Sequence, residues 1–188
     1  MTAEPRIIVV TGVQAAGKTA VGRMLAERFE RGVFIEADAL QRMVVSGGVW
    51  VTDEGGPGVP KGEASRQLRL RLRNACLLAR SFHEAGFTAV VDDIIIGERW
   101  HHLCKELSGV PFHLVVLAPN LATVEARDAA RDKVVRGGLS GGWAAYLDGE
   151  LRATMSAHGV WVDSSGQTPE ETADEVLRRV WDEGLVES

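Results

Sequence analysis

Cysteines and long apolar runs are scarce in this chain of 188 residues. Its two cysteines, Cys76 and Cys104, lie far apart and lack metal-ligand spacing, so we expect neither a zinc site nor a disulfide framework. No apolar run approaches the roughly 18 residues of a membrane-spanning helix, and the first residues lack the pattern of a signal peptide. These absences predict a cytoplasmic protein with free thiols and no membrane partner.

An excess of positive charge is also missing. The chain carries 21 lysines and arginines against 26 aspartates and glutamates, which gives a net charge of −5. This balance excludes a chain-wide cationic surface for duplex nucleic acid, and we expect no nucleic-acid partner. Hydrophobic residues make up 45% of the chain and charged residues 25%, as is typical of a globular protein. The length suits one domain, which we predict to span residues 1–188.

Short β-branched segments alternate with longer amphipathic segments along the chain. The expected strands cover residues 6–11, 33–36, 87–92, 112–118 and 159–163. The expected helices cover about residues 18–29, 39–45, 63–85, 98–107, 121–131 and 169–183. Alternation of this kind is typical of an α/β fold with a parallel sheet. Two Gly-rich stretches, residues 46–62 and 135–142, interrupt it, and we predict mobile segments at about residues 46–62 and 127–142.

The strongest motif connects the first expected strand to the first expected helix. It matches the Walker A pattern G-x-x-x-x-G-K-[ST] in the run Gly12-Val13-Gln14-Ala15-Ala16-Gly17-Lys18-Thr19. In such a loop, backbone N–H groups and the helix N-terminus point at phosphate oxygens. Lys18 can reach the β- and γ-phosphates, and the Thr19 hydroxyl can ligate Mg²⁺. The motif therefore predicts a nucleoside triphosphate site with magnesium.

Three aspartates follow expected strands. Asp38 comes just after the second strand, and Asp92 and Asp93 end the third. Because ligands bind beyond the carboxyl ends of parallel strands, we expect these carboxylates near the phosphate loop. Asp38 suits the base that orients an acceptor hydroxyl and takes its proton, although a helix N-cap is the alternative. Asp92 occupies the Walker-B-like position for Mg²⁺, and Asp93 suits either role.

Basic residues gather after the fourth expected strand. Arg127 and Arg131 are four residues apart and share a helix face, and Lys133 and Arg136 follow closely. Arginines that swing over a γ-phosphate neutralise charge in the transition state and exclude water, so we predict a lid here. A solvated helix that is balanced by neighbouring acidic residues is the alternative. We expect most arginines of residues 63–85 to be solvated, although some could face an anionic or polar substrate.

Five segments of the sequence together resemble one known family. They are the phosphate loop, IEAD at 35–38, VVDDIIIG at 90–97, EARDAAR at 125–131 and WVDSSGQTPEET at 161–172. Together they resemble the chloramphenicol phosphotransferase-like family, and the last segment also looks like the related shikimate and gluconate kinases. The resemblance implies a P-loop NTPase of the α/β class, with a nucleoside-monophosphate-kinase-like three-layer fold and a five-stranded parallel sheet. It also implies ATP and Mg²⁺ as cofactors.

The same resemblance assigns roles to individual residues. Asp38 would match the family's catalytic base, and Arg127 and Arg131 would match its lid arginines. The loop at residues 164–167 would sit near the adenine, so Ser165 and Gln167 are assigned to the nucleotide site. A further lid arginine of the family is replaced here by valine at position 134.

These features predict an ATP-dependent phosphotransferase that moves the γ-phosphoryl group to a hydroxyl of a small molecule, either an antibiotic or a metabolite. Asp38 would take the hydroxyl proton, while Lys18, Mg²⁺ and Arg131 would spread the developing charge. Two alternatives stay open. One is a nucleotide or nucleoside kinase on the same fold, and the other is a toxin-type or regulatory nucleotide-binding module.

Overall fold

A parallel sheet forms the centre of the molecule. The computed structural model describes residues 4, 6–51, 58–130 and 142–187. Its parallel strands are β1 (Ile7–Gly12), β2 (Gly32–Glu36), β3 (Thr88–Asp92), β4 (Phe112–Leu117) and β5 (Val160–Val162). They lie side by side in the order β2-β3-β1-β4-β5. The α/β class and the five parallel strands that the sequence predicts are therefore confirmed.

The three central strands are wholly buried. Every residue of β1, β3 and β4 is shielded from solvent, whereas the edge strand β2 is partly exposed. Helices cover both faces of a parallel sheet, so its central strands consist of continuous apolar runs such as Ile7-Ile8-Val9-Val10. Fully burying one such side chain contributes about 1.5–3 kcal/mol. The packing of these runs therefore holds the strand ends, and the loops that follow them, in fixed places.

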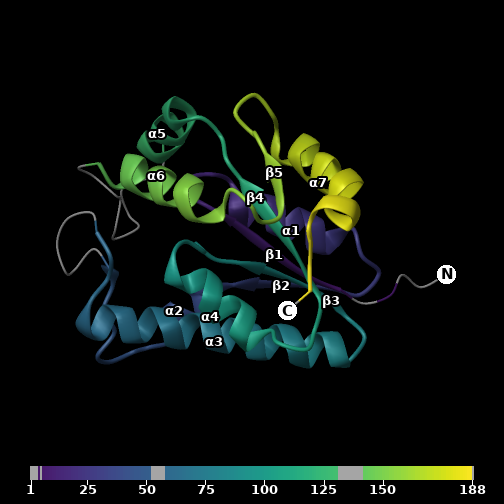
Figure 1. Cartoon of the computed structure of the whole chain (residues 1–188). Coiled ribbons are helices and arrows are strands. Elements are labelled where there is room, and N and C mark those ends of the chain that lie inside the picture. The colour runs from purple at the N-terminus through teal and green to yellow at the C-terminus, as the bar shows by residue number, and fades with distance from the viewer. Residues whose placement is uncertain (1–3, 5, 52–57, 131–141, 188) are drawn as a thin grey trace.

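Helices pack on both faces of the sheet, as Figure 1 shows. They are α1 (Lys18–Glu27), α2 (Ala37–Arg42), α3 (Gly62–Glu84), α4 (Glu98–Glu106), α5 (Leu121–Ala129), α6 (Trp143–Met155) and α7 (Pro169–Glu183). On one face α1 packs against α7, and on the other α3 packs against both α2 and α4. The helices α5 and α6 pack on each other. This is the three-layer arrangement that the sequence predicts.

Two elements are absent from the sequence-based prediction. The first is α6, whose buried residues Trp143, Leu147, Leu151 and Met155 recur every four positions. This periodicity is typical of an amphipathic helix, but the Gly-rich stretch before it conceals where the helix begins. The second is the strand β6 (Leu185–Val186), which pairs antiparallel with the start of β4. A two-residue strand has no periodicity of its own, so its sequence gives no signal.

The carboxyl ends of the parallel strands meet at one edge of the sheet. Asp92, the last residue of β3, is in register with Val10 of β1 and Glu36 of β2. Gly12, the last residue of β1, is in register with Leu117 of β4. The loops that follow these strands therefore lie next to one another. They carry the residues that the sequence assigns to the nucleotide and the acceptor.

The two cysteines lie on neighbouring helices of one layer. Cys76 on α3 is buried, Cys104 on α4 is half-buried, and both are free cysteines. Burial raises the pKa of the Cys76 thiol to about 12. None of the helices in the described part of the chain combines the length and the apolar character needed to cross a bilayer.

Candidate active site

The phosphate loop passes from the end of β1 to the start of α1. At Gly12, φ is 148°, and a Cβ atom there would stand 2.4 Å from the carbonyl oxygen of Leu117. Gly17 has a φ of 100° and forms the N-cap of α1. The first position requires glycine because of a close approach, and the second because of its left-handed backbone. The loop can thus curl around an anion at the N-terminus of α1.

The middle of this loop has a strained backbone and accepts a hydrogen bond from a lysine. Ala15 has a φ of 61°, and it is the only non-glycine with a positive φ in the described residues. Such a backbone costs about 1–2 kcal/mol, which the packing around the loop must offset. The Nζ atom of Lys18 donates to the carbonyl oxygen of Val13 at 3.0 Å. The lysine ammonium group therefore lies against the loop that would hold the phosphates.

Thr19 and Asp92 bring two oxygen donors together beside the loop. The Thr19 hydroxyl on α1 donates to Oδ2 of Asp92 at 2.7 Å. Asp92 is buried, and burial raises the pKa of its carboxyl group, against the opposing effects of the Lys18 charge and the Thr19 hydrogen bond. Hard oxygen donors of this kind suit Mg²⁺, which usually takes one or two protein oxygens together with phosphates and water. Within the described residues, no group of three or more His, Cys, Asp or Glu side chains could hold a metal by itself.

Asp38 lies in the first turn of α2, directly after β2. The N-cap of this helix is Glu36, with an extended backbone at φ −86° and ψ 112°, so the alternative prediction that Asp38 is the N-cap is wrong. The Asp38 side chain is 56% exposed, and its Oδ1 accepts a hydrogen bond from Nη1 of Arg71 at 2.8 Å. One carboxylate oxygen is thus anchored, while the side chain as a whole faces solvent.

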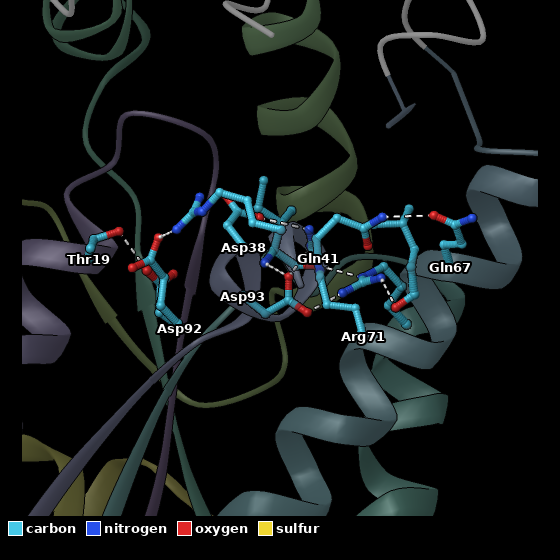
Figure 2. Close-up of polar contacts among 12 residues, drawn as sticks. Thr19, Asp38, Gln41, Gln67, Arg71, Asp92 and Asp93 are labelled. Atoms are coloured by element: carbon cyan, nitrogen blue, oxygen red, sulfur yellow. Dashed lines mark hydrogen bonds and ion pairs between the residues drawn. The ribbon is translucent and has the colours of Figure 1, made fainter. Parts of the chain in front are cut away.

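Asp93 differs from its neighbour because two arginines bind its carboxylate, one of which, Arg71, is labelled in Figure 2. Its Oδ1 accepts from Arg71, its Oδ2 accepts from Arg99, and its side chain is only 1% exposed. Burial alone would raise the pKa of this carboxyl group, but the charges of the two arginines outweigh burial and lower it. That Asp93 serves Mg²⁺ or the acceptor stays a prediction, which the structure does not favour because both of its oxygens already bind guanidinium groups.

Arg71 is an exception to the expectation that most arginines of this helix are solvated. It lies on α3, where its side chain is only 7% exposed, and it bridges Asp38 and Asp93. Burial disfavours the charge on Arg71, but the attraction of Asp93 and Asp38 outweighs that effect and raises the pKa. A signal was available, because Arg71 precedes Ala75 and Ala79 at steps of four on the buried face of α3. By contrast Arg66, Arg69 and Arg73 of the same helix are exposed, as the sequence predicts.

A glutamine pair holds the described start of the first Gly-rich stretch against α3. The Oε1 atom of Gln67 accepts from the backbone N–H of Val49 at 2.8 Å and from Gln41 at 2.9 Å. The Nε2 atom of Gln67 donates to the carbonyl oxygen of Gly47 at 2.7 Å. Figure 2 shows Gln41 and Gln67 beside Arg71, on the same side of the site as Asp38. Gly47 and Val49 are therefore attached to α2 and α3, the helices that carry Asp38 and Arg71, and residues 52–57 of the predicted mobile segment lie outside the described residues.

Arg127, on α5, contacts the phosphate loop and the loop after β5. Its Nη2 donates to the carbonyl oxygen of Ser164 at 2.8 Å, and its Nη1 donates to that of Ala16 at 3.4 Å. The same Nη1 would stand 3.9 Å from a Cβ atom on Gly17. Arg127 thus connects α5, the phosphate loop and the loop after β5. The other basic residues of the predicted lid, Arg131, Lys133 and Arg136, lie outside the described residues, as does the rest of 131–141.

The loop after β5 carries the two residues assigned to the adenine. The Ser165 hydroxyl accepts from the backbone N–H of Asn120 at 2.8 Å, which connects this loop to the loop after β4. Gln167 donates to Glu175 at 2.6 Å and accepts from the Thr172 hydroxyl at 3.0 Å. Both side chains therefore already have protein partners. The structure places their loop next to the phosphate loop, through the contact of Ser164 with Arg127.

A family model matches almost the whole chain. It describes chloramphenicol phosphotransferase-like proteins and covers residues 5–181. No curated protein sequence matches the chain.

Solved structures, two of them named as kinases, are also similar to this one. The tunicamycin resistance protein of Deinococcus radiodurans has 21% identity and a TM-score of 0.64, over 98% of this chain and 99% of the other. Shikimate kinase from Acinetobacter baumannii has 18% identity and a TM-score of 0.65, over 96% and 94% of the two chains. A sugar kinase from Janibacter sp. HTCC2649 has 20% identity and a TM-score of 0.63, over 93% of each chain. At these identities the likeness shows a shared fold.

Proposed function

This chain belongs to the chloramphenicol phosphotransferase-like family, and we propose that it transfers the γ-phosphoryl group of ATP to a hydroxyl of a small molecule, with Asp38 as the base. One observation carries the assignment of the base. The half-exposed carboxylate of Asp38 follows β2, and the buried Asp92, which accepts from the exposed Thr19, ends the neighbouring strand β3 at the edge where the phosphate loop lies. A phosphoryl donor and an acceptor hydroxyl can meet between these groups.

The phosphate loop and Lys18 form the proposed donor side. Backbone N–H groups at the start of α1 would bind the phosphate oxygens of ATP, and the Lys18 ammonium group would contact the β- and γ-phosphates. Arg127 would add positive charge from the side of α5, where it already touches the loop at Ala16. Ser165 and Gln167 would border the adenine. The fixed donors in this arrangement would offset the charge that builds up as the phosphoryl group moves.

Thr19 and Asp92 are the proposed Mg²⁺ ligands. Their oxygens are adjacent, Asp92 is buried, and both are hard donors, so the residues present fit this ion. When bound, the ion would neutralise charge on the β- and γ-phosphates. Asp93 is left out of this set because Arg71 and Arg99 take both of its oxygens.

Asp38 would act on the acceptor side. Its Oδ1 is bound by Arg71, and we assign the acceptor hydroxyl to Oδ2. The hydroxyl oxygen would form a bond to the γ-phosphorus while the bond from that phosphorus to the bridging oxygen breaks and ADP leaves. The hydroxyl proton would pass to Asp38. Arg131, together with Arg127, would cover the reacting groups as part of a lid that spans residues 127–142, and residues 46–62 would close the acceptor side.

An isotope label that follows the transferred phosphoryl group identifies the class of the acceptor. The experiment uses ATP that carries oxygen-18 in its γ-phosphoryl group, the purified protein and a metabolite extract supplemented with chloramphenicol, tunicamycin, shikimate and gluconate. Mass spectrometry should find the label in one hydroxylated small molecule. Label in nucleosides or nucleoside monophosphates alone would favour a nucleotide kinase. Binding of ATP without any labelled product would contradict the proposal and favour a regulatory module.

We also propose a cytoplasmic location, with neither a nucleic acid nor a membrane as partner. Two unpaired cysteines and a need for ATP fit a reducing compartment. The net charge of −5 gives no general attraction to nucleic acid.

A further inference from the structure

We propose that Arg71 is a positioning residue, which aims the carboxylate of Asp38 at the acceptor and is itself held by Asp93 and Arg99. This inference rests on the proposed function, because it concerns how the base of that reaction is oriented. It assigns Arg71 no contact with substrate.

The contacts form a chain that runs from the interior of the protein to the site. Arg99 begins it on α4, where it donates to Asp93, to the carbonyl oxygen of Ile94 at 2.7 Å and to that of Leu68 at 3.2 Å. Asp93 in turn accepts a hydrogen bond from Arg71, and Arg71 also donates to Asp38 at 2.8 Å. Figure 2 shows Arg71 between Asp93 and Asp38. Three helices and the end of β3 therefore determine where one carboxylate oxygen of Asp38 lies.

Exposure falls steeply along this chain. The side chain of Asp38 is 56% exposed, that of Arg71 is 7% exposed and that of Asp93 is 1% exposed. An exposed aspartate on a helix of six residues would otherwise sample several rotamers. A buried guanidinium group that is fixed from behind removes this freedom. The contact with Arg71 thus fixes the orientation of the exposed Asp38 carboxylate.

Charge balance explains why the arrangement includes both carboxylates. Arg71 and Arg99 carry two positive charges, and Asp93 supplies one negative charge between them. Asp38 supplies the second negative charge, so the four groups together are neutral. A buried cation without a matching anion is strongly destabilising. Arg71 is therefore held to Asp38 by the same requirement that holds it to Asp93.

The two contacts also require an arginine. Guanidinium has two Nη groups in a rigid plane, and here one binds Asp38 while the other binds Asp93. A lysine keeps the charge but offers one compact ammonium group on a flexible stem. We therefore expect Arg71→Lys to keep the ion pair with the buried Asp93 and to lose the fixed orientation of Asp38.

The test compares Arg71→Lys with the control Arg73→Lys, an exposed arginine two positions along α3. With the acceptor identified by labelling, kcat of Arg71→Lys should fall on the order of 100-fold, since a small misplacement of a reacting group has that effect. The KM for ATP should stay unchanged, and Arg73→Lys should match the wild type. In an Asp38→Asn background, Arg71→Lys should cause no further loss, because it acts through Asp38.

Two results would overturn the inference. One is an equal loss from Arg71→Lys in the wild-type and Asp38→Asn backgrounds, which would show that Arg71 acts independently of Asp38. The other is a crystal structure of Arg71→Lys in which the Asp38 carboxylate keeps its wild-type position. The crystal structure needs no acceptor, so it decides the positioning role even if labelling finds no product. Absence of product would count against the proposed function alone.

Discussion

The hydroxyl of Thr19 donates to Oδ2 of Asp92 at 2.7 Å, although 73 positions separate the two residues in the sequence. The contact joins the start of α1 to the end of β3, so the two oxygens that we assign to Mg²⁺ are already adjacent. A metal site of this kind needs little rearrangement when Mg²⁺ and ATP bind. The pair therefore allows direct predictions about metal dependence.

Asp92→Asn should weaken the binding of Mg²⁺ without unfolding the protein. The amide keeps the size of the side chain and can accept the Thr19 hydrogen bond, but it removes the negative charge. We expect the Mg²⁺ concentration for half-maximal activity to rise about 10- to 100-fold, the range seen when groups around a metal are altered. A Mg²⁺ titration of ADP release measures this. Asp174→Asn on α7 is the control, and an unchanged titration curve for Asp92→Asn would contradict the metal assignment.

Asp93→Asn should instead act on stability. It removes the buried carboxylate between Arg71 and Arg99, so that only the exposed Asp38 is left to balance their two charges, and breaking a buried pair in this way costs about 3–5 kcal/mol. Urea unfolding at neutral pH measures the change in the free energy of unfolding. A loss of less than about 1 kcal/mol would show that solvent reaches this cluster. Adjacent aspartates should thus give different phenotypes, metal dependence for Asp92 and stability for Asp93.

Two glycines inside helices should respond oppositely to alanine. A Cβ atom on Gly149 of α6 would meet nothing within 4 Å, so Gly149→Ala should stabilise the protein by about 0.5–1 kcal/mol. A Cβ atom on Gly22 of α1 would lie 2.8 Å from the ring of Phe34. Gly22→Ala should therefore destabilise the protein by about 1–3 kcal/mol, because the ring must move. Thermal unfolding of the two variants compares them, and shifts in the same direction would contradict the packing at α1.

The two free thiols should differ in reactivity. Burial raises the pKa of Cys76 to about 12, and its thiol is shielded, so at pH 8 it is protonated and out of reach. The half-buried Cys104 should react first with iodoacetamide, since the thiolate is the nucleophile and needs access. Peptide mass spectrometry after brief labelling distinguishes the sites. Labelling of Cys76 in the native protein at the rate of Cys104 would contradict the packing of α3.

Local motifs explain why much of the fold and half of the site could be predicted. The phosphate loop, with Lys18 and Thr19, depends on consecutive residues between one strand and one helix, and such patterns are visible in sequence. The aspartates at strand ends were also visible, because apolar runs mark where strands stop. The sequence could not separate Asp92 from Asp93, since their roles depend on partners from α1, α3 and α4.

The alternation of side chains at the strand end separates the two aspartates. Successive residues of an extended chain point to opposite sides, so Asp92 reaches Thr19 while Asp93 reaches Arg71. Arg71 was overlooked because an arginine in a charged helix is usually solvated. Its place on the buried face of α3 was the one available signal. The contacts of Arg71 and Arg99 with Asp93 thus depend on how the helices pack, which a single sequence shows only weakly.

The most direct test of the account is Asp38→Asn, measured for both phosphoryl transfer and ATP binding. Transfer should fall about 100-fold or more, because the base is lost, while the Kd for ATP should stay unchanged, because the phosphate loop is intact. Glu36→Gln, whose carboxylate lies two residues earlier and pairs with Arg42, is the matched control and should keep wild-type transfer. Wild-type turnover in Asp38→Asn would contradict the assignment of Asp38 as the base of the reaction.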